Sequence, residues 1–388
     1  MATKTGRQRR NNTGSIRPRG PERWQLVYTL RSGTGKARRQ GYETVSGTRQ
    51  QAEARLREIL TGIDNRTHVE RAKESTATYL KRWLSLYAVN TRETTLRGYE
   101  GIVRRYLVPQ IGDIPLGDLE PDHIQGMYKK MLSSGLSAQT ILHTHRLLSQ
   151  ILGQAAGQRP RVIQENPCEF VSPPRVDAQP QATLDDSTLG TFHKAIEGSL
   201  YCEVYLTAID TGCRRSELLG LRWPYCDLEG KALMIVAGLH RLTGATPPLQ
   251  LRETKTARSR RRISITQELV DTLRQLKVRQ MASALELGIP WREDGYVFAK
   301  VDLSPFDPEK VSKDFTGRMQ AAGIKGITLH NLRHTMATLA LDSGVSVSVV
   351  QERLGHASAK TTHDVYAHVM PGAHVDAAER IASRVRGA

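Results

Sequence analysis

The sequence predicts a multi-domain α+β protein, because three stretches of the chain have different hydrophobic periodicities. Near the N-terminus, apolar residues alternate with polar ones as they do in strands. From 72 to 172 they recur every three to four residues, as in helices, and from 178 to 388 helical patterns enclose short β-like runs. At 388 residues, the chain is long enough for two or three domains with separate cores.

Residues 1–68 are expected to form a basic arm followed by a three-stranded sheet with one helix. Trp24, Val27, Tyr28 and Leu30 follow a strand-like pattern, and glycines suited to a hairpin turn come after them. The expected strands are 15–17, 24–31 and 39–43, and the expected helix is 48–60.

The positive charge of the chain is concentrated in this first block. The whole chain has a net charge of +17, and residues 1–40 contain eleven Lys or Arg side chains and one acid, Glu22. Such a density of positive charge indicates a polyanionic partner, and for a soluble protein this partner is usually nucleic acid. A solubilising tail is the alternative, but the strand-like pattern within the same stretch favours a folded module.

Residues 72–172 are expected to form a bundle of four helices. Apolar residues recur at helical spacing from Tyr79 to Tyr87 and from Leu96 to Leu107. Pro121 suits a first helical turn, and Ser137 suits the N-cap of the last long helix. Burial in a core is the favoured interpretation of the aromatic residues, and a base-stacking platform is the alternative.

Residues 178–388 follow a proline-containing linker and are expected to be mostly helical, with a small antiparallel sheet and a helical tail. The basic segment 252–262 lies between two expected strands and is interpreted as a hairpin that probes DNA, or as a solvated turn. The expected strands are 232–236, 249–253 and 262–265. The expected helices are 185–198, 200–211, 215–220, 266–287, 308–322, 328–343, 346–354 and 360–369.

Cationic side chains stand at helix starts in this third block. Arg214 lies where one helix ends and the next begins, so its guanidinium and the free amides there suit a phosphate. His330 and Arg333 are three residues apart on one helix face and can donate to the same phosphate. His330 and His334 have the spacing of zinc ligands, but no Glu follows His330, which disfavours a zinc site.

Tyr366 gains significance only in combination with these cations. A tyrosine hydroxyl, whose pKa is ordinarily about 10, is a poor nucleophile unless nearby positive charge stabilises the phenolate. Taken alone, a packed tyrosine is the simpler interpretation. Together with His356, ten residues before it, and the cations above, it indicates phosphoryl transfer.

Four segments of the third block together resemble the catalytic domain of the tyrosine recombinases, the lambda-integrase family. They are TGCRRSELLGLRW (211–223), ETKTARSRRRISI (253–265), HNLRHTMATLALDSG (330–344) and ERLGHASAKTTHDVYAHV (352–369). The second block resembles the core-site-binding domain of that family. The first block is similar to the arm-binding domains of phage and conjugative-element integrases.

The resemblance implies a catalytic set. Tyr366 would be the nucleophile that forms a 3′-phosphotyrosyl link, and Arg214 and Arg333 would clamp the non-bridging oxygens. His330 would act as general acid/base or phosphate ligand, and His356 as a further donor to the phosphate.

The remaining implied roles concern proton transfer, support and DNA contact. Lys255 would protonate the leaving 5′ oxygen, and Glu217 would orient Arg214 without being catalytic itself. The residues expected to contact DNA are Arg17, Arg19, Arg31, Arg38, Arg39, Arg258 and Arg260.

By the same resemblance, the chain would be a site-specific recombinase that integrates and excises a mobile element through a Holliday junction. It would need neither metal nor ATP, and the run Gly33–Lys36 indeed lacks the other residues of a P-loop. Its partners would be core-type and arm-type DNA sites and three further copies of the chain, with room for host DNA-bending and excision-directionality factors. A non-cleaving DNA-binding regulator, a type IB topoisomerase-like relaxase and a basic nucleic-acid chaperone are the alternatives.

Composition restricts where such a protein would work. The chain contains no run of about 18 apolar residues, the length of a membrane helix, and no apolar segment follows the basic N-terminus. Its four cysteines are scattered, without a C-x-x-C pair. We therefore expect a cytoplasmic, nucleoid-associated, bacterial or phage-encoded protein with reduced thiols and no membrane partner.

Overall fold

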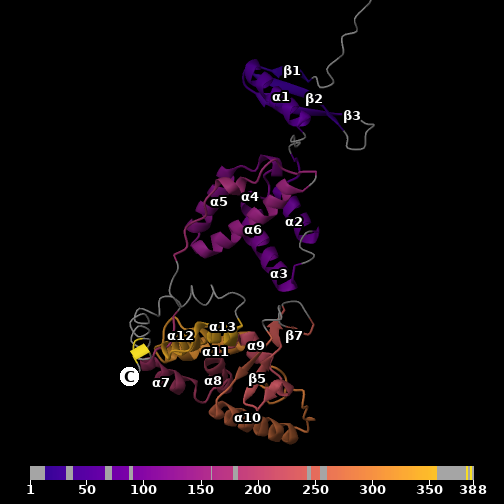
Figure 1. Cartoon of the computed structure of the whole chain (residues 1–388). Helices are drawn as coiled ribbons and strands as arrows, with labels where there is room; N and C mark the ends of the chain where they lie inside the picture. The colour runs from indigo at the N-terminus through magenta and orange to yellow at the C-terminus, as the bar shows by residue number, and fades with distance from the viewer. Residues whose placement is uncertain are drawn as a thin grey trace, which may run out of the picture. The chain divides into compact units, whose positions relative to one another are not determined.

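The elements of the chain are seen in a computed structural model (Figure 1). It describes residues 14–31, 38–65, 72–86, 91–158, 160–177, 182–242, 246–253, 260–355, 382, 385 and 386. The chain divides into two units, Met1–Asp177 and Ala178–Ala388, which are described separately below.

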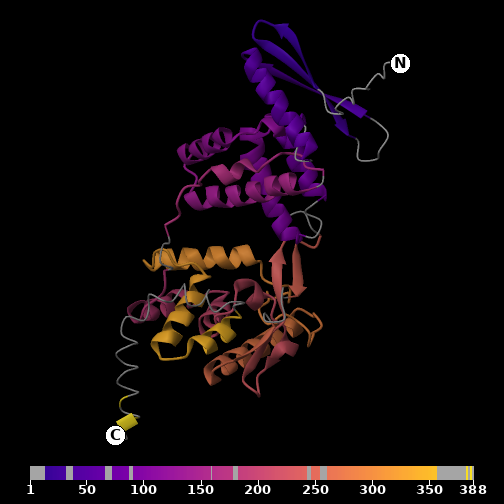
Figure 2. The same cartoon turned by 45° about the horizontal axis from the view of Figure 1, so that its top comes forward.

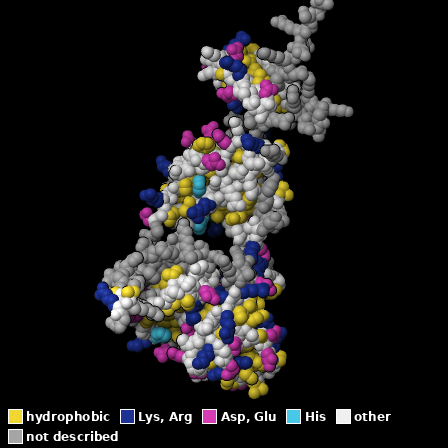
Figure 3. Space-filling view, in the orientation of Figure 1, with side chains coloured by type: hydrophobic (Ala, Val, Ile, Leu, Met, Phe, Trp, Pro, Cys, Tyr) yellow, Lys and Arg dark blue, Asp and Glu magenta, His cyan; other side chains and the backbone are white. Residues whose placement is uncertain are grey.

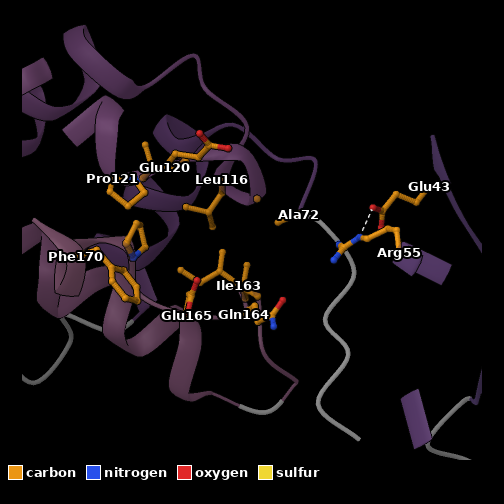
Figure 4. A pocket seen from close by; sticks show the side chains of 14 residues that line it. Glu43, Arg55, Ala72, Leu116, Glu120, Pro121, Ile163, Gln164, Glu165 and Phe170 are labelled. Carbon is orange, nitrogen blue, oxygen red and sulfur yellow. Dashed lines mark hydrogen bonds and ion pairs between the residues drawn. The ribbon is translucent and has the colours of Figure 1, made fainter. Parts of the chain in front are cut away.

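The first unit begins with a three-stranded antiparallel sheet in the order β1-β2-β3. Its strands are β1 (Ser15–Gly20), β2 (Arg23–Arg31) and β3 (Arg38–Ser46), and they precede α1 (Arg49–Asp64). Leu26 and Tyr28 of β2 pack with apolar residues of α1, so the helix covers one face of the sheet. Arg55 of α1 also donates to Glu43 of β3 at 2.9 Å (Figure 4). The predicted three-stranded sheet with one helix is confirmed.

The rest of the first unit is helical, as predicted. It contains α2 (Thr76–Leu86), α3 (Glu93–Ile102), a π-helical stretch (Val103–Leu107), α4 (Val108–Ile111), α5 (Pro121–Ser133) and α6 (Ala138–Gly157). Pro121 begins α5, and the Ser137 hydroxyl caps α6 by accepting from the Thr140 amide. Trp83 is 1% exposed and donates to Gln154 of α6 at 2.7 Å. The predicted core role is therefore correct for Trp83.

In its described residues, the second unit is mostly helical and contains two small antiparallel sheets. Its helices are α7 (Asp186–Ile196), α8 (Cys202–Thr211), α9 (Arg215–Leu219), α10 (Gln267–Glu286), α11 (Pro308–Ala321), α12 (Asn331–Asp342) and α13 (Val347–Leu354). One sheet has the order β4-β5-β8, from Cys226–Asp227, Ala232–Ile235 and Arg261–Ser264. The other pairs β6 (Ala237–Arg241) with β7 (Leu249–Glu253), a two-stranded ribbon at one edge of the unit (Figures 1 and 2).

The predicted hairpin across segment 252–262 is wrong. β7 pairs with β6, and β8 pairs with β5, so the strands on either side of the basic segment belong to different sheets. Ile263 of β8 is 1% exposed and lies opposite Leu233, which places β8 in the core, whereas Leu251 of β7 is 37% exposed. The strand β6 was not predicted, because Gly238 interrupts its pattern. A Cβ at Gly238 would lie 3.2 Å from Ser216 Cβ, so the glycine allows α9 to approach this strand.

Two further observations concern the whole described chain. Among the described residues, no helix combines the length and the apolar character needed to cross a membrane. The cysteines Cys168, Cys202, Cys213 and Cys226 are free thiols.

Candidate active site

Four elements of the second unit supply the candidate site: the turn between α8 and α9, the strand β8, the start of α12 and the end of α13. Arg214 comes from the first, with Glu217 in the adjoining α9, Arg261 from the second, and His330 and Arg333 from the third. The end of α13 contributes backbone carbonyls, to which both Arg261 and Arg333 donate.

Arg214 is held at the N-cap of α9. Its amide donates to Glu217 Oε2 at 2.9 Å, and its Nη1 donates to Glu217 Oε1 at 2.7 Å. The preceding Gly212 ends α8 in the left-handed conformation with φ of +64°, which a residue with a Cβ rarely adopts. The side chain of Arg214 remains 38% exposed, so part of its guanidinium is open to solvent while Glu217 fixes its direction.

Glu217 lies between two arginines. Its side chain is 5% exposed, and Arg261 donates to it from Nη2 at 2.8 Å and from Nη1 at 3.3 Å. Burial by itself raises the pKa of the Glu217 carboxyl, but the hydrogen bonds and charge of Arg261 and the charge of Arg214 lower it to about 2. Glu217 is therefore a carboxylate at neutral pH, which can accept hydrogen bonds but has no proton to give.

Arg333 is buried and spans two segments. Its Nη1 donates to the Gly212 carbonyl at 2.7 Å, and its Nη2 donates to the Leu354 carbonyl at 2.8 Å. Burial, and next the charge of Arg214, lower the pKa of Arg333 to about 10, so the guanidinium stays charged at neutral pH. It thereby joins the end of α8, just before Arg214, to the end of α13.

His330 stands at the N-cap of α12, next to His334 on the same helix. Burial lowers the pKa of His330, and the positive charges of Arg333, Arg214 and Arg215 lower it further. The two rings meet edge to face with centroids 5.1 Å apart, and burial, His330 and Arg333 lower the pKa of His334 to about 4. A neutral imidazole can take up a proton, so His330 suits a general base beside two arginines.

The described part of the chain contains no group of three His, Cys, Asp or Glu side chains arranged to hold a metal ion. The zinc spacing of His330 and His334 therefore has no third ligand among the described residues.

The structure brings together the predicted catalytic and supporting residues that it describes. Arg214, His330 and Arg333 lie close enough for their charges to act on one another, and Glu217 contacts Arg214. The predicted residues outside the described part of the chain are Lys255, Arg258, His356 and Tyr366.

The residues predicted to contact DNA are exposed where their side chains are described. Arg17 and Arg19 lie on β1, and Arg260 donates to Glu253 at 2.6 Å. Arg31, Arg38 and Arg39 lie in β2 and β3, and their side chains are outside the described part.

Sequence reasoning missed Arg261 as a member of this site. From the sequence alone, Arg261 is one of several basic residues of segment 252–262. Its position could have drawn attention, because in β8 it alternates onto the same face as the buried Ile263. An arginine on a buried face needs an acidic or carbonyl partner there.

Two family models match the chain. Residues 187–372 match the model described as the phage integrase family. Residues 77–132 match the N-terminal SAM-like domain of phage integrases. The first match includes α7 to α13 and therefore all described residues of the candidate site.

Relatives align with most of the chain. A tyrosine recombinase XerC-like protein of Caldanaerobacter subterraneus subsp. tengcongensis is 27% identical over 380 residues, covering 93% of this chain and 96% of its own. The ICEBs1 integrase of Bacillus subtilis is 25% identical over 318 residues, covering 80% of this chain and 85% of its own.

Solved structures share the fold. The Tn1549 transposon integrase in complex with transposon right end DNA aligns with a TM-score of 0.69 and 21% identity, covering 79% of this chain and 99% of that one. A lambda integrase tetramer bound to a Holliday junction aligns with a TM-score of 0.56 and 19% identity, covering 91% and 97%. The predicted fold class is thus confirmed. By these matches, the chain belongs to the phage integrase family of tyrosine recombinases, which are site-specific DNA recombinases.

Proposed function

We propose that this chain is the integrase of a mobile element and that Tyr366 is its nucleophile. The observation that carries the proposal is the convergence of Arg214, Arg333 and His330 at one place in the second unit. Two arginines and a proton-accepting histidine, paired among the described residues only with the carboxylate of Glu217, form a site suited to a phosphodiester. The segment that contains Tyr366 follows α13, whose last carbonyl already accepts from Arg333.

The proposed reaction is a transfer of the backbone phosphate to tyrosine. The Tyr366 oxygen attacks phosphorus and gives its proton to His330, while the bond from phosphorus to the 5′ oxygen breaks. Lys255 gives a proton to that leaving oxygen. Arg214, Arg333 and His356 stabilise the charge that develops on the non-bridging oxygens. A free 5′ hydroxyl then attacks the phosphotyrosine in reverse, so the phosphodiester is reformed without ATP.

We further propose that the reaction is independent of metal ions. Two arginines, a lysine and two histidines would supply the positive charge that a divalent cation supplies in many phosphoryl-transfer enzymes. Cleavage is therefore expected to continue in EDTA.

We propose that residues 1–68 bind arm-type DNA sites through the open face of the sheet. Because Leu26 and Tyr28 face α1, the alternate residues of β2 face away from it. The register places Arg17 and Thr44 on either side of Gln25 on this open face, and Arg19 donates to Gln25 at 2.8 and 3.0 Å. A sheet face with arginine and amide side chains suits the edges of bases in a major groove.

Residues 72–172 are proposed to bind core-type sites, and 178–388 to cut them. Lys and Arg side chains are visible on both units (Figure 3), which favours contact with the DNA backbone along the chain. Exchange between two duplexes breaks four strands, so we propose that four copies assemble on DNA, inside the cell and at the nucleoid. Host DNA-bending and directionality factors remain further proposed partners.

The test of this function is a covalent protein–DNA adduct. The purified protein is mixed with labelled fragments of the DNA that flanks its own gene, in EDTA, and the mixture is quenched with SDS. We expect a shifted band with the wild type and with Tyr225→Phe, an exposed tyrosine of the same unit, and no band with Tyr366→Phe.

Each alternative has its own outcome in this experiment. Specific binding with no covalent band from any fragment would indicate a non-cleaving regulator. Nicking of supercoiled DNA at random positions would indicate a relaxase. Binding without sequence preference and without adduct would indicate a nucleic-acid chaperone.

A further inference from the structure

Arg261 is a buried arginine with several contacts to other elements of the second unit. Its side chain is 4% exposed. It donates to both carboxylate oxygens of Glu217, at 2.8 and 3.3 Å, and its Nε donates to the backbone carbonyl of Arg353 at 2.7 Å. One rigid guanidinium therefore joins β8, α9 and the last turn of α13, which are distant in sequence.

Arg261 lies where two catalytic segments leave the described fold. Segment 254–259, which contains Lys255, ends one residue before Arg260, the direct neighbour of Arg261. At the end of α13, Gly355 has φ of +65°, and a Cβ there would lie 3.1 Å from Arg261 Cδ. The next residue after Gly355 is His356, so the Arg261 side chain packs against the point from which this segment departs.

The end of α13 is held by two guanidinium groups on consecutive carbonyls. Arg261 donates to the Arg353 carbonyl and Arg333 donates to the Leu354 carbonyl, at 2.7 and 2.8 Å. The last carbonyls of a helix have no partner within the helix, so these donors define how the chain leaves it. Arg333 is proposed to bind the DNA phosphate as well. The described contacts of Arg261 are all with other residues of the second unit, and no phosphate contact is proposed for it.

A buried ion pair is a poor way to gain stability alone. Apolar side chains of similar volume often stabilise a core equally well or better, because the desolvation of two charges offsets most of the free energy gained from their attraction. Arg261 differs from a simple ion-pair partner, because besides contacting Glu217 it donates a hydrogen bond to the Arg353 carbonyl of α13. A planar fork can make all three contacts, and a lysine ammonium cannot reproduce them.

We infer that Arg261 is a positioning residue for DNA cleavage. It fixes the carboxylate that directs Arg214, and it fixes the helix end from which the segment with His356 and Tyr366 leaves. The inference rests on the proposed function, because it assumes that these residues act on the DNA phosphate.

The test separates cleavage from DNA binding in Arg261→Lys. This variant keeps a positive charge beside Glu217 but loses the fork. The control is Arg274→Gln, because Arg274 of α10 lies outside the basic segment 252–262, is exposed and pairs with the exposed Glu229. The DNA is the flanking fragment that yields an adduct with the wild type. The measurements are the dissociation constant and the single-turnover rate of adduct formation at saturating protein.

We expect Arg261→Lys to bind DNA within about twofold of the wild type and to form adduct about 10- to 100-fold more slowly, since misplacement by about 1 Å can cost this much. Arg274→Gln is expected to match the wild type in rate. A rate for Arg261→Lys equal to the wild type would overturn the inference. So would a parallel loss of binding and rate, which would show that Arg261 only supports folding. If the wild type itself formed no Tyr366-dependent adduct, the proposed function would fail first and the inference with it.

Discussion

Replacement of Glu217 by glutamine tests the electrostatic centre of the site. The carboxylate lies between Arg214 and Arg261, and its side chain is 5% exposed. Glutamine has nearly the same shape but no charge. Glu217→Gln therefore removes the negative charge of Glu217 from beside the buried guanidinium of Arg261.

The structure predicts the size of the effect. The pKa of Glu217 is about 2, against 4.5 for an ordinary glutamate. At roughly 1.4 kcal/mol per pH unit, this difference corresponds to about 3 kcal/mol of folding free energy. Removal of one partner from a buried ion pair typically costs about 3–5 kcal/mol, which agrees. For a unit of this size, the melting temperature should fall by about 6–12 °C at pH 7.

The effect has a defined pH dependence. Because the pKa is lower in the folded protein than in the unfolded chain, the stabilisation is complete above about pH 4.5 and is lost as the pH falls toward 2. By this linkage about 1 kcal/mol remains at pH 3. The difference between the wild type and Glu217→Gln should shrink accordingly.

The assay is urea unfolding at pH 7, 5, 4 and 3, followed by circular dichroism. The matched control is Glu229→Gln, because the Glu229 side chain is 90% exposed and its pair with Arg274 is on the surface. We expect the control to change stability by less than about 0.5 kcal/mol. A Glu217→Gln effect below about 1 kcal/mol at pH 7, or one equally large at pH 7 and pH 3, would refute the reasoning.

Three further predictions concern the fold and DNA binding. Gly212→Ala should destabilise the protein by about 2 kcal/mol or more in the same urea titration, because φ is +64° and the new Cβ would lie 2.1 Å from Met336 Cε. The control Gly190→Ala, which has open space around its Cβ, should be neutral or slightly stabilising. The His334 ring should stay neutral down to about pH 5 and titrate near pH 4 in histidine NMR spectra, and a midpoint near 6.5 would contradict the described burial. Affinity for the flanking DNA fragment should fall about a thousandfold or more between 50 and 200 mM salt, and a flat salt dependence would contradict binding through many phosphate contacts.

Local features of the chain were predictable because their causes are local. Ser137 caps a helix and Pro121 begins one, since a cap depends on residues within one turn. Helical periodicity likewise predicted the buried position of Trp83. The order and spacing of the four segments 211–223, 253–265, 330–344 and 352–369 indicated the family, although the sequence does not show which of their residues are in contact.

Contacts between distant segments depended on the tertiary structure. Whether β7 pairs with β6 or with β8 depends on which strand faces enter the core, and a basic strand such as Arg261–Ser264 resembles a solvated turn in sequence alone. The role of Arg261 became visible only when Glu217, 44 residues away, and the Arg353 carbonyl, 92 residues away, met its guanidinium. Periodicity and motifs in the sequence predict which residues form each helix and strand. A buried charge acquires its partners only when those elements pack, because only there does the loss of water make the pairing obligatory.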